Sequence, residues 1–506
     1  MKKIILLSIF LTFVLKIYII YNSQLTFYSD DAIYAEIARF WLQRKFSLVF
    51  HPTWPPLYPF LTFVVNNLLD SWENSARVVS ALAGSALILP LYLIGRKFLP
   101  TSAAFLFSLS VILVGPIFKI SILAQSDMLA TMLVVSAITL FIYKRFYLAS
   151  IVFGLTYLTR SEGLMFFGLS LVFLVFIKKI KTIPMFLIIF LVTISPYLIA
   201  LKLQTGSFSL SQKASAQIKQ GHAFQLVKGT TWIQEVVSVK RPNYKSDYFK
   251  GGLKHVLEYS DWFWFWTIQK ANVWKGVLIK NIPTWALLLS VVGITTLLKR
   301  HSWETFYVIF LTIPAVALTI FATPLADVRY LLWVFPIIIG SMYAGVRSIF
   351  YFFTKNKKGV VFIPAGILLI FMLPVSDMQV FLNPKDYAQN FTNTYSRPEI
   401  EKAGLWIKEN TKKENPRIMA RHEGIEFYAD GQTVYIPQEL TLAVTLEYAK
   451  KNKVDYFTAS SDQLANDKNL SPLLGENFQS KTLKKVFVSE ANERIIVIYE
   501  TSFERL

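Results

Sequence analysis

Eleven apolar runs, which we interpret as membrane-spanning helices, constrain the fold of this chain more than any other feature. A helix needs roughly 17 to 25 residues to cross a hydrocarbon core of about 30 Å. The runs lie near residues 4–21, 78–96, 101–116, 127–143, 146–160, 163–177, 183–201, 282–298, 305–323, 331–350 and 360–376. Of the 506 residues, 54% are hydrophobic, and the mean hydropathy of +0.44 exceeds that of ordinary soluble chains. The sequence therefore predicts a polytopic α-helical membrane protein with about 11 transmembrane helices.

The basic residues of the loops predict how these helices are oriented. Lys and Arg in short loops are retained on the cytoplasmic side. If the N-terminus is cytoplasmic, every second loop is basic: Lys2, Lys3, Arg96, Lys97, Lys144, Arg145, Lys178, Lys179, Lys181, Lys299, Arg300, Lys355, Lys357 and Lys358. Loops 22–77 and 202–281 and the tail from residue 377 then lie outside. We predict a multi-pass cell-membrane protein with an extracytoplasmic C-terminal domain.

Charge and cysteine content exclude several function classes. Much of the net charge of +20 lies in these loops, so it does not indicate a nucleic-acid partner. Lys16 interrupts the first run, and we expect its long stem to carry the ammonium to the outer interface. The chain has no cysteine, which excludes disulfides and thiolate chemistry, and its five histidines show no ligand spacing. We therefore predict no metal site.

The first outer loop contains adjacent acids, Asp30 and Asp31, directly after the first apolar run. Acids at a membrane boundary are costly to desolvate and are usually kept for chemistry or ion handling. The spacing of apolar residues in 32–42 predicts an amphipathic interfacial helix that holds the pair near the headgroups. Four prolines make residues 51–59 non-helical, and a further helix is expected over 60–69.

The chain divides into a membrane domain, residues 1–376, and a soluble domain, residues 377–506. The outer loop 202–281 of the membrane domain ends in a tryptophan-rich cluster near residues 262–274, which is typical of an interfacial anchor. In the soluble domain we predict helices at 400–410 and 440–451 and strands at 417–420, 454–460, 485–489 and 494–500. Strands that alternate with helices predict a small α/β domain on the outer face.

An ordered set of motifs resembles the GT-C membrane glycosyltransferases. The set comprises Asp30-Asp31, Pro-Pro-Leu-Tyr-Pro at 55–59, Arg77-Val-Val-Ser-Ala-Leu-Ala-Gly84, Ser126-Asp127, Leu158-Thr-Arg-Ser-Glu-Gly163 and Arg329-Tyr330. It is closest to the bacterial and archaeal branch related to protein O-mannosyltransferases and lipid A aminoarabinose transferases. The resemblance covers residues 1–376, and the tail also looks like the soluble outer domain of that branch. Many relatives have Asp-Glu in place of Asp30-Asp31.

The resemblance implies transfer of a sugar from a polyprenyl-phosphate carrier to an acceptor at the outer membrane face, with inversion. An acceptor hydroxyl is a poor nucleophile and needs a positioned base. We assign Asp30 as this base, and Asp31 as a residue that orients the acceptor or the base. We expect no cofactor, although Asp31 could bind a divalent cation if one is used. The alternative for both acids is a solvated turn or a helix cap.

Three outer-face cations are candidates for binding the phosphate that leaves. A departing phosphate needs no general acid if cations neutralise its charge. We assign Arg160, Arg329 and Lys119 to this task. The alternatives are a mutual ion pair between Arg160 and Glu162, and contacts of Arg329 and Lys119 with lipid headgroups.

Further substrate-binding candidates are His51, Asp127, Glu162 and Tyr330. His51 could bind phosphate, but a lone loop histidine is more often structural. Asp127 could equally cap the helix that begins after Ser126. These residues do not identify the sugar, and the acceptor is open among glycans, lipids and proteins.

Other functions remain as alternatives. A lipid-linked oligosaccharide flippase or proton-coupled transporter should carry ionisable residues at midplane and repeated halves, whereas the acids here cluster at one face. An outer-face polymerase or ligase that uses a diphosphate-linked glycan would rely on arginines rather than aspartates. A non-catalytic scaffold would not need Asp30.

Overall fold

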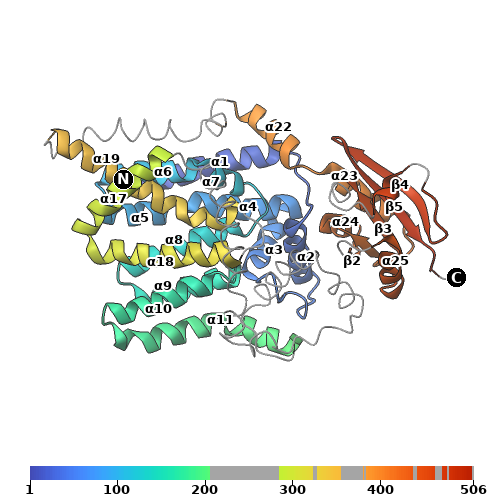
Figure 1. The fold of residues 1–506 in the computed structure, drawn as a ribbon, viewed down its shortest axis with the longest axis horizontal. Helices are drawn as coiled ribbons and strands as arrows, with labels where there is room; N and C mark the ends of the chain where they lie inside the picture. Colours follow the sequence, from blue (N-terminus) through green and yellow to red (C-terminus); the bar gives the residue numbers. More distant parts are fainter. Residues whose placement is uncertain are drawn as a thin grey trace.

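The computed structural model describes residues 1–205, 284–322, 327–354, 380, 383–436, 441–461, 470–475 and 478–503. Most of the predicted outer loop 202–281, with its tryptophan-rich cluster, lies outside these residues. So do the last predicted span, 360–376, and the expected domain boundary at 376/377. Figure 1 shows a bundle of roughly aligned helices with a β-sheet beyond one end.

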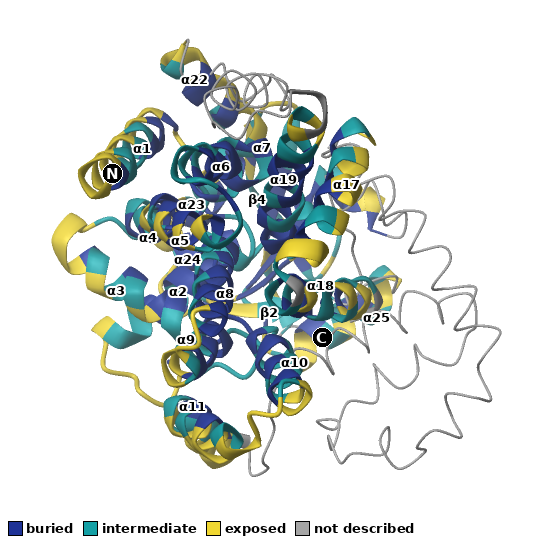
Figure 2. Cartoon of the chain, turned by 90° about the vertical axis from the view of Figure 1, so that its left-hand side faces the viewer, coloured by how far each residue is buried: buried dark blue, intermediate teal, exposed yellow. Residues whose placement is uncertain are grey.

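The described part of the bundle carries the first ten predicted spans as helices. The second span, 78–96, is divided between two helices, α4 (Trp72–Ala86) and α5 (Ile88–Phe98). Each of the other nine spans corresponds to one helix: α1 (Lys2–Asn22), α6 (Thr101–Leu113), α8 (Asp127–Ile142), α9 (Phe146–Thr159), α10 (Gly163–Phe176), α11 (Ile183–Thr205), α17 (Thr284–Arg300), α18 (Ser302–Ala322) and α19 (Phe335–Thr354). Within the described residues, five helical segments are long and apolar enough to cross a membrane. Figure 2 shows α8 in the interior, where its side chains are almost all buried.

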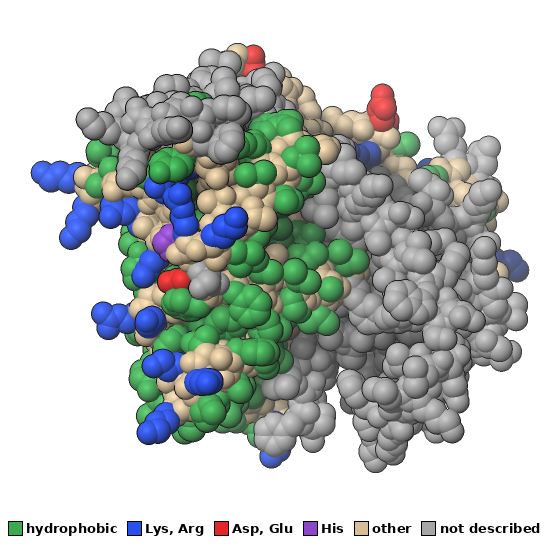
Figure 3. Space-filling view, turned by 60° about the vertical axis from the view of Figure 1, so that its left-hand side comes forward, with side chains coloured by type: hydrophobic (Ala, Val, Ile, Leu, Met, Phe, Trp, Pro, Cys, Tyr) green, Lys and Arg blue, Asp and Glu red, His purple; other side chains and the backbone are tan. Residues whose placement is uncertain are grey.

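The predicted alternation of basic loops agrees with the structure at one end of the bundle. Lys97 lies over the ring of Tyr143, Lys144 over Trp303, and Arg300 over Tyr351. The turns after α5, α8 and α17 are therefore neighbours. In Figure 3, Lys and Arg side chains gather along one edge beside a broad hydrophobic surface, as expected where spanning helices leave the hydrocarbon.

The expectation for Lys16 is wrong. Its side chain is fully buried, with Nζ 3.3 Å from Ser85 Oγ and 5.8 Å from the centroid of the Phe118 ring. The ammonium therefore points between α1, α4 and α7 (Gly115–Ile120) and not to the interface. Gly84 makes room for it, because a Cβ at that position would lie 2.9 Å from Nζ.

The first outer loop folds into two short helices, α2 (Asp30–Leu42) and α3 (Leu57–Leu69). The amphipathic helix predicted over 32–42 is confirmed, but it begins at the acidic pair itself. The second helix begins three residues earlier than expected, because Pro59 lies in its first turn, where a missing N–H costs little. Phe60, Phe63 and Phe50 surround Trp41 and join the two helices.

The C-terminal part forms a five-stranded sheet with the order β2-β1-β3-β5-β4. Its strands are β1 (Arg417–Ala420), β2 (Gln432–Tyr435), β3 (Tyr456–Ser460), β4 (Leu483–Ala491) and β5 (Arg494–Thr501). The first three pair in parallel and the last two are antiparallel, and all four predicted strands are confirmed. Helices α23 (Pro398–Asn410) and α24 (Glu423–Tyr428) share one apolar core with the sheet, and α25 (Leu442–Lys451) shares another.

The sequence did not predict α22 (Pro384–Tyr395), α24 or β2. Of these, α22 packs on the end of α1. The short helix α24 packs on α2 and so connects the sheet to the first outer loop. The acidic pair thus lies at the junction between the bundle and the sheet.

Candidate functional site

The two acids of the predicted catalytic pair have different surroundings. Both lie in the first turn of α2. Asp30 is 38% exposed, and its Oδ2 lies 3.7 Å from Arg329 Nη1. Asp31 instead turns back on the chain, where its Oδ1 accepts the backbone N–H groups of Tyr28, Ser29 and Ala32. Of the two acids, Asp30 is therefore the one that contacts Arg329.

Asp31 shapes the turn that presents Asp30. It lines a small cavity of about 20 Å³ together with Arg77, whose guanidinium donates to the carbonyl of Leu25. Burial raises the pKa of Asp31 to about 6, although the three N–H donors and Arg77 act in the opposite direction. These contacts favour a structural role for Asp31, in which it positions its neighbour through the backbone.

Replacing Asp31 by alanine should destabilise the fold. Asp31→Ala leaves three N–H groups without an acceptor, which we expect to cost about 2 kcal/mol of unfolding free energy. The measurement is the apparent unfolding temperature of the purified protein in detergent.

Asp31→Asn is the matched control, because its carbonyl oxygen still accepts these bonds. Between pH 3.8, the ordinary pKa of an aspartate, and pH about 6, the folded wild type keeps Asp31 protonated, whereas the unfolded chain releases this proton. The stability of the wild type relative to Asp31→Asn should therefore fall as the pH rises through this window. An alanine variant as stable as the asparagine variant would contradict this role.

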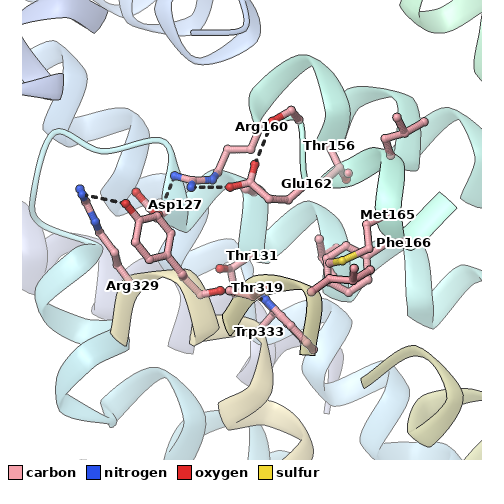
Figure 4. A pocket seen from close by; sticks show the side chains of 17 residues that line it. Asp127, Thr131, Thr156, Arg160, Glu162, Met165, Phe166, Thr319, Arg329 and Trp333 are labelled. Atoms are coloured by element: carbon pink, nitrogen blue, oxygen red, sulfur yellow. Dashed lines mark hydrogen bonds and ion pairs between the residues drawn. The ribbon is translucent and has the colours of Figure 1, made fainter. Parts of the chain in front are cut away.

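A cavity of about 360 Å³ is lined at one side by Arg160 and Arg329. Its lining comes from α8, α9, α10, α18 and η2 (Val328–Val334) and from the turn between α9 and α10: Asp127, Ala130, Thr131, Val134, Thr156, Arg160, Ser161, Glu162, Gly163, Leu164, Met165, Phe166, Leu318, Thr319, Arg329, Tyr330 and Trp333. Figure 4 shows the charged groups at one end and Met165 and Phe166 at the other. The cavity is thus polar at one end and apolar at the other.

Arg160 is fixed at the polar end by two carboxylates. Nη1 lies 2.7 Å from Asp127 Oδ1, and Nη2 lies 2.7 Å from Glu162 Oε1. The side chains of Arg160 and Asp127 are 9% and 4% exposed, so this ion pair is almost dry. The side chain of Ser126, the N-cap of α8, makes no capping bond, and Asp127 binds Arg160.

Arg329 links the cavity to Asp30. It follows Asp327, whose carboxylate accepts the Arg329 N–H and lies 3.2 Å from its Nε. Its Nη2 donates to Tyr330 Oη, and its guanidinium lies 5.1 Å from the centroid of that ring. The guanidinium therefore contacts Asp30 while the side chain lines the cavity.

Four of the predicted site residues do not line this cavity: the acids Asp30 and Asp31, described above, and the substrate-binding candidates His51 and Lys119. His51 Nδ1 accepts the N–H of Thr53, and the His51 carbonyl accepts from Tyr197 Oη. Burial lowers the pKa of His51 to about 4, so its ring is neutral at pH 7. Lys119 lies on α7, which packs against η2.

Sequence reasoning missed two residues of the site. Tyr34 lies one turn after Asp30, and its hydroxyl is 2.7 Å from Ser126 Oγ beside Asp127. Asp327 precedes Arg329 by two residues, and this close spacing of opposite charges was an available signal. Across the described ranges, no group of three or more His, Asp or Glu side chains is placed to hold a metal ion.

The sequence matches no protein-family model and no curated protein, but the structure matches solved structures. An oligosaccharyltransferase of Archaeoglobus fulgidus superposes with a TM-score of 0.60 at 14% identity, over 99% of this chain and 75% of that one. ArnT of Cupriavidus metallidurans, bound to undecaprenyl phosphate, gives 0.53 at 14% identity, over 97% of both chains. The chain has the GT-C fold.

The oligosaccharyltransferase AglB of Archaeoglobus fulgidus, solved with an inhibitory peptide and a dolichol-phosphate, also matches, with a TM-score of 0.57 at 14% identity over all of this chain and 75% of that one. The GT-C fold agrees with the apolar helices of the bundle, and the chain is a multi-pass membrane protein. The prediction of a polytopic helical membrane protein with a GT-C-like fold is therefore confirmed.

Proposed function

We propose that this protein is a glycosyltransferase that moves a sugar from a polyprenyl-phosphate donor to an acceptor hydroxyl at the outer membrane face. The observation that carries the proposal is the position of Arg329, which contacts Asp30 and lines the cavity. A base for the acceptor and a cation for the leaving phosphate are thus side by side. The sugar, hexose or pentose, would lie between them.

The cavity suits a lipid phosphate. Its polar end offers the guanidinium groups of Arg160 and Arg329, which bind phosphate through charge-assisted hydrogen bonds. Its other end is lined by Met165 and Phe166, which would contact the isoprenoid. The GT-C neighbours were solved with dolichol-phosphate and with undecaprenyl phosphate, which supports this class of donor.

In this proposal Asp30 acts as the general base. Its carboxylate is more exposed than that of Asp127, so an acceptor hydroxyl can reach it. The base takes the hydroxyl proton as the oxygen attacks the anomeric carbon, and the phosphate leaves toward the arginines. Attack opposite the leaving group in one displacement gives inversion.

The end of the bundle that carries this site would face the outside. The basic turns after α5, α8 and α17 lie together at one end of the bundle. Asp127 is the first residue of α8 and so lies at the opposite end of that helix. Arg329 lines the same cavity as Asp127 and contacts Asp30. By the positive-inside rule the site and the C-terminal sheet would then be extracytoplasmic. The unit of residues 377–506 would meet acceptors there.

The test is a transfer assay in proteoliposomes. Labelled polyprenyl-phosphate sugars and envelope fractions are supplied, with and without EDTA, and label is followed off the carrier. We expect the wild type to transfer the labelled sugar from one of these donors to an acceptor in the envelope fractions. Movement of intact carrier across the bilayer without transfer would refute the proposal and favour a flippase, and loss of transfer in EDTA would reveal a requirement for a divalent cation.

A further inference from the structure

The helix α24 of the C-terminal sheet unit packs against the backbone of Phe27, three residues before Asp30. Tyr428 Oη accepts the backbone N–H of Phe27 at 2.9 Å, and Phe27 is fully buried. At Gly424, a Cβ would lie 2.3 Å from the Phe27 carbonyl oxygen. Only glycine allows this approach, so α24 lies directly against the Phe27 backbone.

Side chains extend this contact to α2. The rings of Phe27 and Phe427 pack edge to face with centroids 5.2 Å apart. The guanidinium of Arg39, on α2, lies over the ring of Phe427, 4.1 Å from the ring centroid. Its Nη1 lies 2.6 Å from Asp430 Oδ1. The short helix α24 therefore holds both the entry to α2 and its third turn.

Only two residues separate Phe27, which contacts α24, from Asp30. Tyr28 and Ser29, which connect Phe27 to Asp30, both donate their N–H groups to Asp31. The segment from Tyr28 to Ala32, which follows Phe27 directly, is therefore a turn held by hydrogen bonds to the Asp31 carboxylate. A shift of Phe27 has no flexible residue to absorb it before Asp30.

The first residue of α24 lies in the electrostatic field of the acidic pair. Burial and the charges of Asp30 and Asp31 raise the pKa of Glu423 to about 7, although a hydrogen bond from its own backbone N–H and the charge of Arg421 act in the opposite direction. The charges of the acidic pair thus act on the first residue of α24, which agrees with the packing of α24 on α2.

We propose that Tyr428 and Gly424 are positioning residues for Asp30, so that docking of α24 sets the rate of the transfer step. The C-terminal sheet unit then acts on catalysis through the backbone of the first outer loop. This inference rests on the proposed function. It adds that the base is held from outside the membrane bundle.

Tyr428→Phe tests this role, because it removes a single acceptor oxygen and keeps the ring. We expect the kcat of transfer to fall about tenfold, with the KM for the lipid donor within about twofold of the wild-type value, since the donor cavity is not touched. Amide hydrogen exchange over residues 27–32 should also accelerate. Gly424→Ala should produce both effects more strongly.

Tyr499→Phe is the matched control, because it removes a buried tyrosine bond to the Leu473 carbonyl elsewhere in the same sheet. It should leave kcat and exchange over 27–32 unchanged. If Tyr428→Phe behaves like this control while the wild type transfers sugar, the positioning role is refuted. A wild type that transfers nothing refutes the proposed function and the role together, and the exchange data then show whether the contact of α24 with Phe27 is purely structural.

Discussion

Asp30→Asn is expected to lower the kcat of sugar transfer by a factor of about 10² to 10⁴, the range that general-base catalysis contributes. The amide keeps the size of the carboxylate but cannot take a proton from the acceptor. The donor should still bind, because the lining of the cavity does not include Asp30. The measurement is single-turnover transfer from a labelled lipid donor at saturating enzyme, with donor binding measured separately.

Asp70→Asn is the matched control for this change. Asp70 is an exposed residue of the same outer loop, at the end of α3, with φ of 48°, a conformation that asparagine tolerates. Its transfer rate should equal that of the wild type. An Asp30→Asn variant that keeps more than about a tenth of the wild-type rate would remove Asp30 as the base and favour a base supplied by the acceptor.

The different positions of Asp30 and Asp31 follow from where α2 begins. The spacing of apolar residues predicts a helix that begins after the pair, so that both acids could face one substrate. In the structure they lie within its first turn, where consecutive side chains diverge by about 100°. Only one can then face Arg329. A helix start moved by two residues changes the chemistry assigned to Asp31, and helix ends are what sequence patterns predict least well.

Long apolar runs and charge patterns made the bundle predictable. The turn from Arg160 to Glu162 connects the consecutive helices α9 and α10, and Asp127 begins the preceding helix α8. The order of these helices therefore brings Arg160 to the same end of the bundle as Asp127, with which it pairs. The helix α24 has six residues and too little periodicity to be recognised. The burial of Lys16 depends on a packing gap at Gly84, which no local pattern indicates.

Arg160 and Arg329 differ in how exposed their carboxylate partners are, so their removal should have different effects on stability. Arg160→Gln would leave Asp127 almost completely buried without its ion-pair partner, so it should damage the fold as well as donor binding. Arg329 pairs with Asp30 and Asp327, whose side chains are 38% and 45% exposed and can be hydrated. Arg329→Gln is therefore the informative variant.

Arg329→Gln should weaken binding of the lipid-phosphate donor about thirtyfold, which corresponds to about 2 kcal/mol for the loss of a hydrogen bond to a charged group. Its unfolding temperature should remain close to that of the wild type. Binding is measured by titration of purified protein with undecaprenyl phosphate and with a neutral polyprenol, and the loss should be confined to the phosphate. Lys119→Gln, a cation of the same predicted set that does not line the cavity, should change the affinity less than about threefold. Equal losses in both variants would mean that the phosphate is attracted by the general charge of the outer face, since a defined site requires Arg329 to contribute more than Lys119.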